Sequence, residues 1–306
     1  MKEEKILDIP KEILPEGMVP CCSLGAGSFG KVKGLLHLHK PTDLAEKQKQ
    51  KETDRWIIKV SHLNSLKRKD TFEREVYFLN YLKKEGHIDL IPELKDSKIC
   101  PHDTGGSHGF QIMRRYDGNM KQLGKKQAQE HKLSKKSLLF TEEQWHTMVK
   151  LAMSLESLKI SHGDFKITNL LYRMNNSGGN VDIRVSDFGF AGFFSSDNIE
   201  TTNYKPLLGF TKRFCKTKNN RFKNSEGTFV QQEGIPSSLL PILNRGQLFL
   251  ECCRFLHNRI KLYKGKEKLH EEDLIKLFQF EKEEVKELKQ FFPNFLGRKK
   301  FFFIYL

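Results

Sequence analysis

The chain contains 306 residues, enough for about two domains of ~150 residues each, and its 38% hydrophobic content predicts a folded protein rather than a disordered one. No apolar stretch reaches the ~18 residues of a membrane span, and residues 1–5 carry no apolar signal segment. The 53 basic and 38 acidic residues give a net charge of +15, which makes an anionic partner a candidate. We therefore expect a folded, basic protein that works in a cytosol.

The cysteines show no spacing that is typical of a metal site. No CxxC pair is present, and no histidine cluster lies near any of them at zinc-finger spacing. We therefore expect reduced structural thiols. The six residues are Cys21, Cys22, Cys100, Cys215, Cys252 and Cys253.

The first motif along the chain is the glycine-rich string LGAGSFGKV at residues 24–32. Its glycines Gly25, Gly27 and Gly30 lack side chains, so backbone N–H groups could approach phosphate oxygens there. Taken alone, the string fits an ordinary glycine turn equally well. A dinucleotide-binding fold is disfavoured because no crossover helix follows.

A short apolar run at residues 56–60 predicts a β-strand with one embedded lysine, Lys59. The charged stretch before it, residues 40–55, is interpreted as a solvated insertion in an extended hairpin. Residues 70–82 then repeat apolar side chains at helical spacing and contain two candidate ion-pair partners for Lys59, Glu73 and Glu75. We favour Glu75 because it lies beside the apolar stripe. A solvent-facing Lys59 is the alternative.

Further elements are predicted in the second half of the chain. After a glycine turn, residues 110–113 read as a strand that ends at Met113. A capping-box pattern at residues 141–144 begins a helix whose apolar face continues to residue 158. Glycine and asparagine at 175–179 predict a hairpin turn before a strand at 181–185. Helices are also expected at 238–263 and 271–292.

Two short strings carry the chemistry: HGDFKITN at residues 162–169 and DFG at residues 187–189. Transfer of a phosphoryl group needs a carboxylate to orient the acceptor, a cation near the migrating charge, and oxygen ligands for magnesium. Four side chains in these strings match those needs. They are Asp164, Lys166, Asn169 and Asp187.

These strings, preceded in order by the glycine-rich string, Lys59 and Glu75, resemble the protein-kinase superfamily. The resemblance covers roughly residues 20–195. It implies an α+β, bilobed protein-kinase-like fold, with a β-rich N-lobe over residues 1–113 that has one main helix. A helical C-lobe over residues 114–306 would diverge from the family after about residue 195.

The resemblance also implies a role for each matching residue. Asp164 would orient the acceptor and accept its proton, and Lys166 would steady the γ-phosphate. Asn169 and Asp187 would hold Mg²⁺ or Mn²⁺. The remaining residues would bind the nucleotide ATP, with Met113 as the gatekeeper before a hinge at residues 114–116. They are Gly25, Gly27, Gly30, Val32, Lys59, Glu75 and Met113.

Within the superfamily, residues 112–117 and 162–171 look most similar to the casein-kinase-1 and vaccinia-related kinase group. The expected activity is ATP-dependent phosphorylation of protein Ser/Thr. A catalytically inactive kinase fold used as a binding scaffold is one alternative, and a small-molecule kinase of the aminoglycoside or choline type is another.

Three features depart from the family pattern. Gly163 replaces the arginine that many kinases use to read a phosphorylated activation loop, so loop ordering through that residue is not expected. No APE string follows residue 189, and a DxW-type helix start is not legible at residues 244–247.

A cluster of basic residues follows the DFG string. It is either a solvated loop or an anion site for an acidic peptide substrate, a phosphoinositide head group or a soluble inositol polyphosphate. Nucleic acid is disfavoured because no base-stacking module accompanies the charge. The cluster comprises Lys205, Lys212, Arg213, Lys216, Lys218, Arg221 and Lys223.

The end of the chain combines an acidic patch at residues 281–287 with an apolar tail at 298–306. This combination resembles the export signals of bacterial type IV secretion effectors, and it fits an amphipathic terminal helix with an ordinary buried or membrane-touching tail as well. The resemblance to export signals implies a kinase secreted into a host-cell cytosol, with peripheral contact at a host membrane as one option. A eukaryotic-like kinase of this compactness is also consistent with a large DNA virus as the source.

Overall fold

The computed structural model describes residues 9–27, 30–37, 56–101, 106–133, 138–174, 181–194, 227–229, 241–256 and 275–291. Five predictions therefore lie outside the described residues: the charged insertion, the tip of the glycine string, the hairpin turn at 175–179, the basic cluster at 205–223 and the apolar tail. The fold is α+β, with a five-stranded antiparallel sheet and several helices. None of the helices in the described ranges is long and apolar enough to cross a membrane.

The chain divides into two compact units. The first contains Met1–Tyr81 and Pro92–Tyr116, and the second contains Leu82–Ile91 and Asp117–Leu306. Each unit has its own sheet, and we describe them one at a time.

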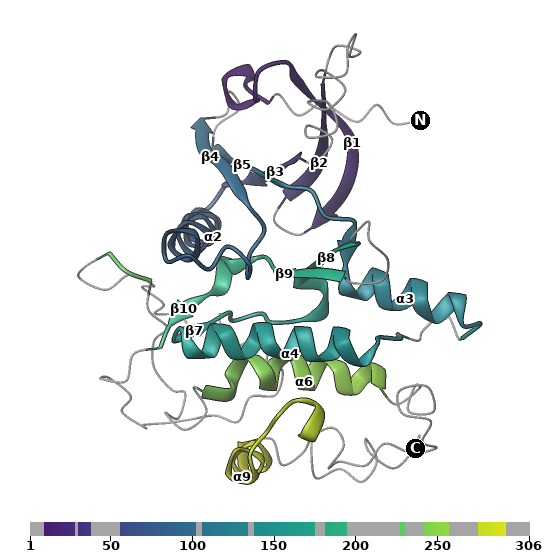
Figure 1. The fold of residues 1–306 in the computed structure, drawn as a ribbon. Helices are drawn as coiled ribbons and strands as arrows, with labels where there is room; N and C mark the ends of the chain where they lie inside the picture. Colours follow the sequence, from purple (N-terminus) through teal and green to yellow (C-terminus); the bar gives the residue numbers. More distant parts are fainter. Residues whose placement is uncertain are drawn as a thin grey trace. The chain divides into compact units, whose positions relative to one another are not determined.

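The first unit is built on an antiparallel sheet with the strand order β1-β2-β3-β5-β4 (Figure 1). Consecutive strands are neighbours except at β3, which pairs with β5, so that β4 becomes an edge strand. Helix α2 (Leu66–Lys84) connects β3 to β4. The strands are β1 (Met18–Gly27), β2 (Gly30–His37), β3 (Trp56–His62), β4 (Leu94–Pro101) and β5 (Ser107–Arg114).

The two faces of this sheet bury different side chains, because successive residues in a strand point to opposite faces. One face carries an apolar core that includes Ile58 and Val60 of β3 and Phe110 and Ile112 of β5. The other face carries Lys59, whose neighbour in register on β5 is Gln111. Phe72 of α2 packs against this second face, where a Cβ atom on Gly109 would lie only 2.5 Å from the Phe72 ring.

The second unit combines helices with two small sheets (Figure 1). A three-stranded antiparallel sheet has the order β6-β8-β9, and β7 pairs with β10. Helices α4 and α6 pack side by side. The strands are β6 (Gly118–Asn119), β7 (Ile160–Ser161), β8 (Leu170–Met174), β9 (Val181–Val185) and β10 (Gly192–Phe193), and the helices are α3 (Met120–Glu130), α4 (Glu142–Ser157), α6 (Leu243–Leu256) and α9 (Lys282–Phe291).

The predicted start of α4 is confirmed. The Thr141 hydroxyl accepts a hydrogen bond from Gln144 N, and the Gln144 side chain accepts one from Thr141 N, which completes a capping box. The predicted hairpin is also confirmed, because β8 and β9 pair antiparallel with Leu170 opposite Val185. Helix α4 precedes the HGDFKITN string, and the hairpin connects that string to DFG.

The helix predicted over residues 271–292 is interrupted. Residues 278–281 leave the helical conformation before α9 begins, and Gln279 takes a φ of 55°. The reason is burial: Phe278 and Phe280 both pack against Phe249 of α6, with ring centroids 5.2 and 5.6 Å away. A turn brings both rings into this cluster.

Candidate active site

In the first unit, Lys59 and Glu75 form a close ion pair. The Lys59 Nζ atom lies 2.7 Å from both carboxylate oxygens of Glu75. The Glu75 side chain is 5% exposed and the Lys59 side chain 22%, so the pair is largely shielded from water. The rival partner Glu73 instead lies 3.9 Å from Lys69, one helical turn away. The predicted choice of Glu75 as the partner of Lys59 is confirmed.

Three predicted nucleotide-binding residues lie in one row across the sheet. Gly25 of β1 is opposite Val32 of β2, and Val32 is opposite Lys59 of β3. Residues that are in register on neighbouring strands share a face. The fold therefore brings Gly25, Val32 and Lys59 to one face of the sheet.

The glycines of the string differ in what the structure requires of them. A Cβ atom on Gly30 would lie 1.8 Å from the Val60 carbonyl oxygen, so close packing against β3 alone demands glycine there. At Gly25, no atom lies within 4 Å of the position that a Cβ would take. Gly27 is paired with Gly30 as the last described pair of the β1–β2 hairpin. Packing thus explains Gly30 but not Gly25.

Met113 lies near the end of β5 and is 4% exposed. Because Gln111 is the neighbour of Lys59 and Met113 follows two residues later, Met113 lies on the Lys59 face of the sheet. Strand β5 ends at Arg114, and the first unit ends at Tyr116. The gatekeeper and hinge roles stay predictions.

In the second unit, three of the four predicted chemical groups are in direct contact. Lys166 Nζ and Asn169 Nδ2 both donate to Asp164 Oδ2, the second at 3.1 Å, and Asn169 Nδ2 also donates to the Asp164 carbonyl at 3.0 Å. A short 3-10 helix, Ile167–Asn169, turns the chain back so that Asn169 reaches Asp164. We refer to Asp164, Lys166 and Asn169 as the carboxylate cluster.

The fourth group, Asp187, is connected to this cluster through the residue before it. Ser186 donates two hydrogen bonds to the Asn169 carbonyl, from N at 2.8 Å and from Oγ at 2.9 Å. Asp187 itself takes the left-handed conformation, with φ 67° and ψ 57°, which costs energy for a residue other than glycine. Such strain persists only where the surrounding structure holds it.

The His162 side chain connects the HGDFKITN string to the residue before DFG. Its Nδ1 accepts a hydrogen bond from Asp164 N at 3.3 Å, so the proton of the neutral ring lies on Nε2, which donates to the Ser186 carbonyl at 2.9 Å. Complete burial lowers the pKa of His162 from its ordinary value, although Asp164 and Asp187 act in the opposite direction. The ring also lies 4.8 Å from the Phe188 ring, centroid to centroid.

Two buried side chains of α6 hold the backbone of the HGDFKITN string, residues 162–169. Asn244 accepts from His162 N and donates to the Ile160 carbonyl, both at 2.9 Å. Gln247 accepts from Phe165 N at 3.0 Å. Sequence reasoning missed both positioning residues, because it searched residues 244–247 for an aspartate. The local sequence gives no signal for either one, because Arg245 lies between them and the backbone groups that they hold are 82 to 84 residues away.

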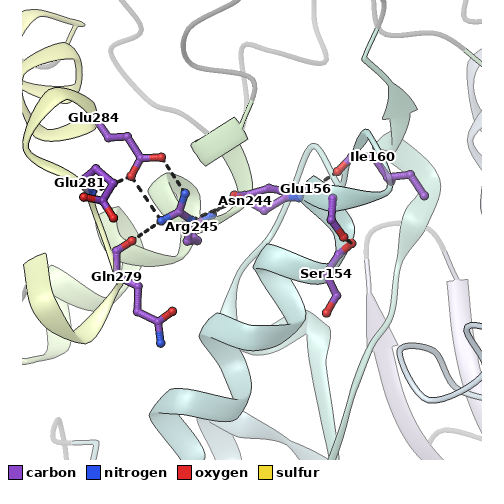
Figure 2. A network of polar contacts seen from close by, with 9 residues as sticks. Ser154, Glu156, Ile160, Asn244, Arg245, Gln279, Glu281 and Glu284 are labelled. Atoms are coloured by element: carbon purple, nitrogen blue, oxygen red, sulfur yellow. Dashed lines mark hydrogen bonds and ion pairs between the residues drawn. The ribbon is translucent and has the colours of Figure 1, made fainter.

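Between those two amides, Arg245 links three helices (Figure 2). Its Nε donates to Glu156 of α4 at 2.9 Å, and its Nη2 donates to Glu284 of α9 at 2.9 Å. Burial raises the pKa of Glu156 to about 7, although the neighbouring Arg245 guanidinium acts to lower it. Buried polar contacts with α4 and α9 therefore fix the helix that holds the HGDFKITN string.

The donor atoms fit magnesium or manganese only as a partial set. Asn169 commits its amide nitrogen to Asp164, so its Oδ1 is the atom suited to a cation, and Asp187 offers a carboxylate. Hard cations such as Mg²⁺ take oxygen ligands of this kind together with phosphate oxygens and water. In the described ranges, no three His, Cys, Asp or Glu residues are grouped so as to hold a metal ion.

No protein-family model matches this chain, and no curated protein matches it.

Proposed function

We propose that this protein is an ATP-dependent protein kinase that transfers the γ-phosphoryl group to serine or threonine of a protein substrate. The observation that carries the proposal is the carboxylate cluster, in which Asp164 is bonded to Lys166 and Asn169. Phosphoryl transfer is catalysed mainly by positioning and by stabilising charge, and this cluster supplies both kinds of group.

Each member of the cluster receives a role from its hydrogen bonds. Asp164 Oδ2 is held by two N–H donors, so we assign Oδ1 to orient the substrate hydroxyl and accept its proton. The Lys166 ammonium group, 32% exposed, would offset charge on the migrating phosphoryl group. Asn169 and Asp187 would hold Mg²⁺ or Mn²⁺, which when bound neutralises phosphate charge. His162 and Ser186 keep the two strings in position.

The first unit supports the proposal independently. The Lys59–Glu75 pair resembles the lysine and glutamate that position the α- and β-phosphates in kinases, and the row that contains Gly25 and Val32 lies on the same face. We include in the proposal a bilobed kinase-like fold with lobes at residues 1–113 and 114–306.

The basic cluster gives the proposal a regulatory part. We include activation by a polyanion, either an inositol polyphosphate or a phosphoinositide, acting through residues 205–223, which carry seven basic side chains. The positive charge of this segment would suit an enzyme that acts in a cytosol, either after delivery into a host cell or at the surface of a host membrane.

The experiment measures transfer of radiolabel from ATP with Mg²⁺ or Mn²⁺, using the full chain, acidic and basic protein acceptors, and inositol hexakisphosphate or phosphoinositide vesicles. Wild type should label protein, and Asp164→Asn and Asp187→Asn should not. Asp89→Asn, which changes an exposed carboxylate in the same unit, should behave as wild type.

Three outcomes would contradict parts of the proposal. Absence of labelling by wild type under every condition would favour a binding scaffold, and labelling only of small hydroxylated or amino-sugar acceptors would favour a small-molecule kinase. Equal labelling by wild type and Asp187→Asn would remove the metal-ligand assignment.

A further inference from the structure

Cys21 and Cys22 are adjacent in β1, yet their sulfur atoms lie only 3.6 Å apart. Successive side chains in a regular strand point to opposite faces, which would keep two such thiols apart. The pairing of β1 with β2 explains the exception. Pro20 is opposite Leu35 and Ser23 is opposite Lys33, so the two cysteines share one partner, Gly34. This is a β-bulge, with two residues opposite one.

Gly34 supplies the space that both sulfurs use. A Cβ atom on Gly34 would lie 2.9 Å from Cys21 Sγ and 3.5 Å from Cys22 Sγ. Both thiols therefore gather over the point where a side chain on β2 would otherwise stand. The bulge and the glycine together bring two neighbouring thiols to one side of the strand.

The two sulfurs differ in accessibility. Cys22 is exposed and Cys21 is half-buried, whereas Cys100, the other cysteine whose side chain is described, is buried in the core of the sheet. Burial raises the pKa of the Cys21 thiol, and the hydrogen bond with Cys22 adds to this effect. A reagent from solvent thus reaches Cys22 first, and Cys21 is the sulfur that follows.

We propose that Cys21 and Cys22 form a reversible redox site that closes to a disulfide between adjacent residues, with a low-molecular-weight disulfide such as oxidised glutathione as the oxidant. The Cys22 thiolate attacks one sulfur of oxidised glutathione and expels one glutathione thiolate. The Cys21 thiol loses its proton to solvent and attacks Cys22 Sγ, which expels the second glutathione. Two protein thiols are oxidised, and one glutathione disulfide is reduced to two thiols.

Closure of this pair produces a disulfide that is easily reduced. The Cα atoms of adjacent residues are ~3.8 Å apart across a trans peptide. Disulfides usually join Cα atoms about 4.4 to 6.8 Å apart, so the closed ring is strained. Strained, exposed disulfides are the labile ones, which suits a switch rather than a permanent cross-link. This inference does not depend on the proposed phosphoryl transfer.

The experiment incubates the reduced full chain with oxidised glutathione and maps unreduced peptides by mass spectrometry. In wild type, the peptide that contains both cysteines should lose two hydrogen atoms and carry no glutathione, and dithiothreitol should restore it. Cys21→Ser should stop at a glutathione adduct on Cys22. Cys100→Ser should close as wild type does.

Gly34→Ala tests the geometry with both thiols retained. Its added methyl group should displace the sulfurs and slow closure at least several-fold, leaving a glutathione adduct on Cys22 to accumulate. As a measurement that needs no variant, phenylarsine oxide should titrate the pair with one arsenic for two thiols.

Stable glutathione adducts on wild type, with no closure, would overturn the proposal. So would closure of Gly34→Ala at the wild-type rate, or titration of the pair by two separate arsenicals.

Discussion

A Cβ atom on Gly163 would lie 2.3 Å from the carbonyl oxygen of Phe190, so the HGDFKITN string packs closely against the segment that contains DFG. Gly163 also has a φ of 75°, a conformation that L side chains rarely adopt. The glycine at this position is therefore required by the backbone. Neither alanine nor arginine fits without moving one string away from the other.

Gly163→Ala should destabilise the protein by more than conformational strain alone explains. The matched control is Gly86→Ala, because Gly86 has a similar φ of 81° and no atom within 4 Å of the Cβ position. We expect about 1 kcal/mol of lost unfolding free energy at Gly86. Gly163→Ala should lose a further ~1–3 kcal/mol from overpacking, as measured by urea denaturation. Equal losses would mean that Phe190 moves freely.

Lys59→Met should lower both stability and phosphoryl transfer. The substitution removes the cation that faces the Glu75 carboxylate, which is 5% exposed. We expect a loss of about 2 kcal/mol in unfolding free energy. This is less than for a fully buried pair, because the Lys59 side chain is 22% exposed. Lys69→Met is the control, since its partner Glu73 lies 3.9 Å away near the surface and should contribute under ~0.5 kcal/mol. The urea concentrations at the unfolding midpoints of the two variants measure these losses. Similar midpoint shifts for Lys59→Met and Lys69→Met would contradict a stabilising role for the Lys59–Glu75 pair.

Loss of the Asn244 side-chain amide should remove a contact that holds the HGDFKITN string against α6. Asn244→Leu leaves the buried His162 N and Ile160 carbonyl without this partner, at ~1–3 kcal/mol for each group. Asn244→Asp keeps an acceptor for His162 N and should be intermediate in both urea stability and radiolabel transfer. If Asn244→Leu and Asn244→Asp transferred label equally, the bond to His162 would have no positioning role.

His162 should make the protein less stable as acidity increases. Its folded-state pKa is lowered from 6.5, so its contribution to stability is present above pH 6.5 and is lost as pH falls through the folded value. His162→Gln cannot take up this proton, and its unfolding free energy should depend less on pH in that range. His146→Gln, on the exposed side of α4, should keep the wild-type slope. Parallel slopes for His162→Gln and wild type would count against the neutral ring.

The contribution of Glu156 to stability should change with pH in the direction opposite to that of His162. Its folded-state pKa is raised from 4.5 to about 7, so its contribution is fully present below pH 4.5 and is lost as pH rises to about 7. Glu156→Gln should lack this loss, which is on the order of 3–4 kcal/mol for such a shift. Urea unfolding at several pH values measures it, with the exposed Glu143→Gln as control. If the unfolding free energy of Glu156→Gln still fell as pH rises from 4.5 to about 7, the loss of stability would come from a group other than Glu156.

Local patterns predicted much of the second unit and part of the first. The capping box at Thr141 and the apolar stripe beside Glu75 are local features, and each defines a helix start or a buried face from a few neighbouring residues. The strands at residues 56–60 and 110–113 also followed from short apolar runs, whereas their pairing with each other did not. The division of the molecule into two lobes and the roles in nucleotide binding stay predictions.

What sequence reasoning missed depends on contacts between distant segments. Nothing near Asn244 indicates that it will meet His162, since the partners are 82 positions apart. The break before α9 results from Phe278 and Phe280 packing on Phe249, which outweighs helical periodicity. The bulge at Cys21 likewise arises from the register of β1 on β2.

Because α6 holds the HGDFKITN string, the string can take its final position only after α6 has been synthesised. The string leaves the ribosome first, and Asn244 and Gln247 are made 82 to 84 residues after the backbone groups they hold. At about 5–20 residues per second, this interval lasts on the order of ten seconds. A nascent chain therefore carries Asp164 before the helix that holds its string exists, and the activity we propose can begin only when α6 is complete.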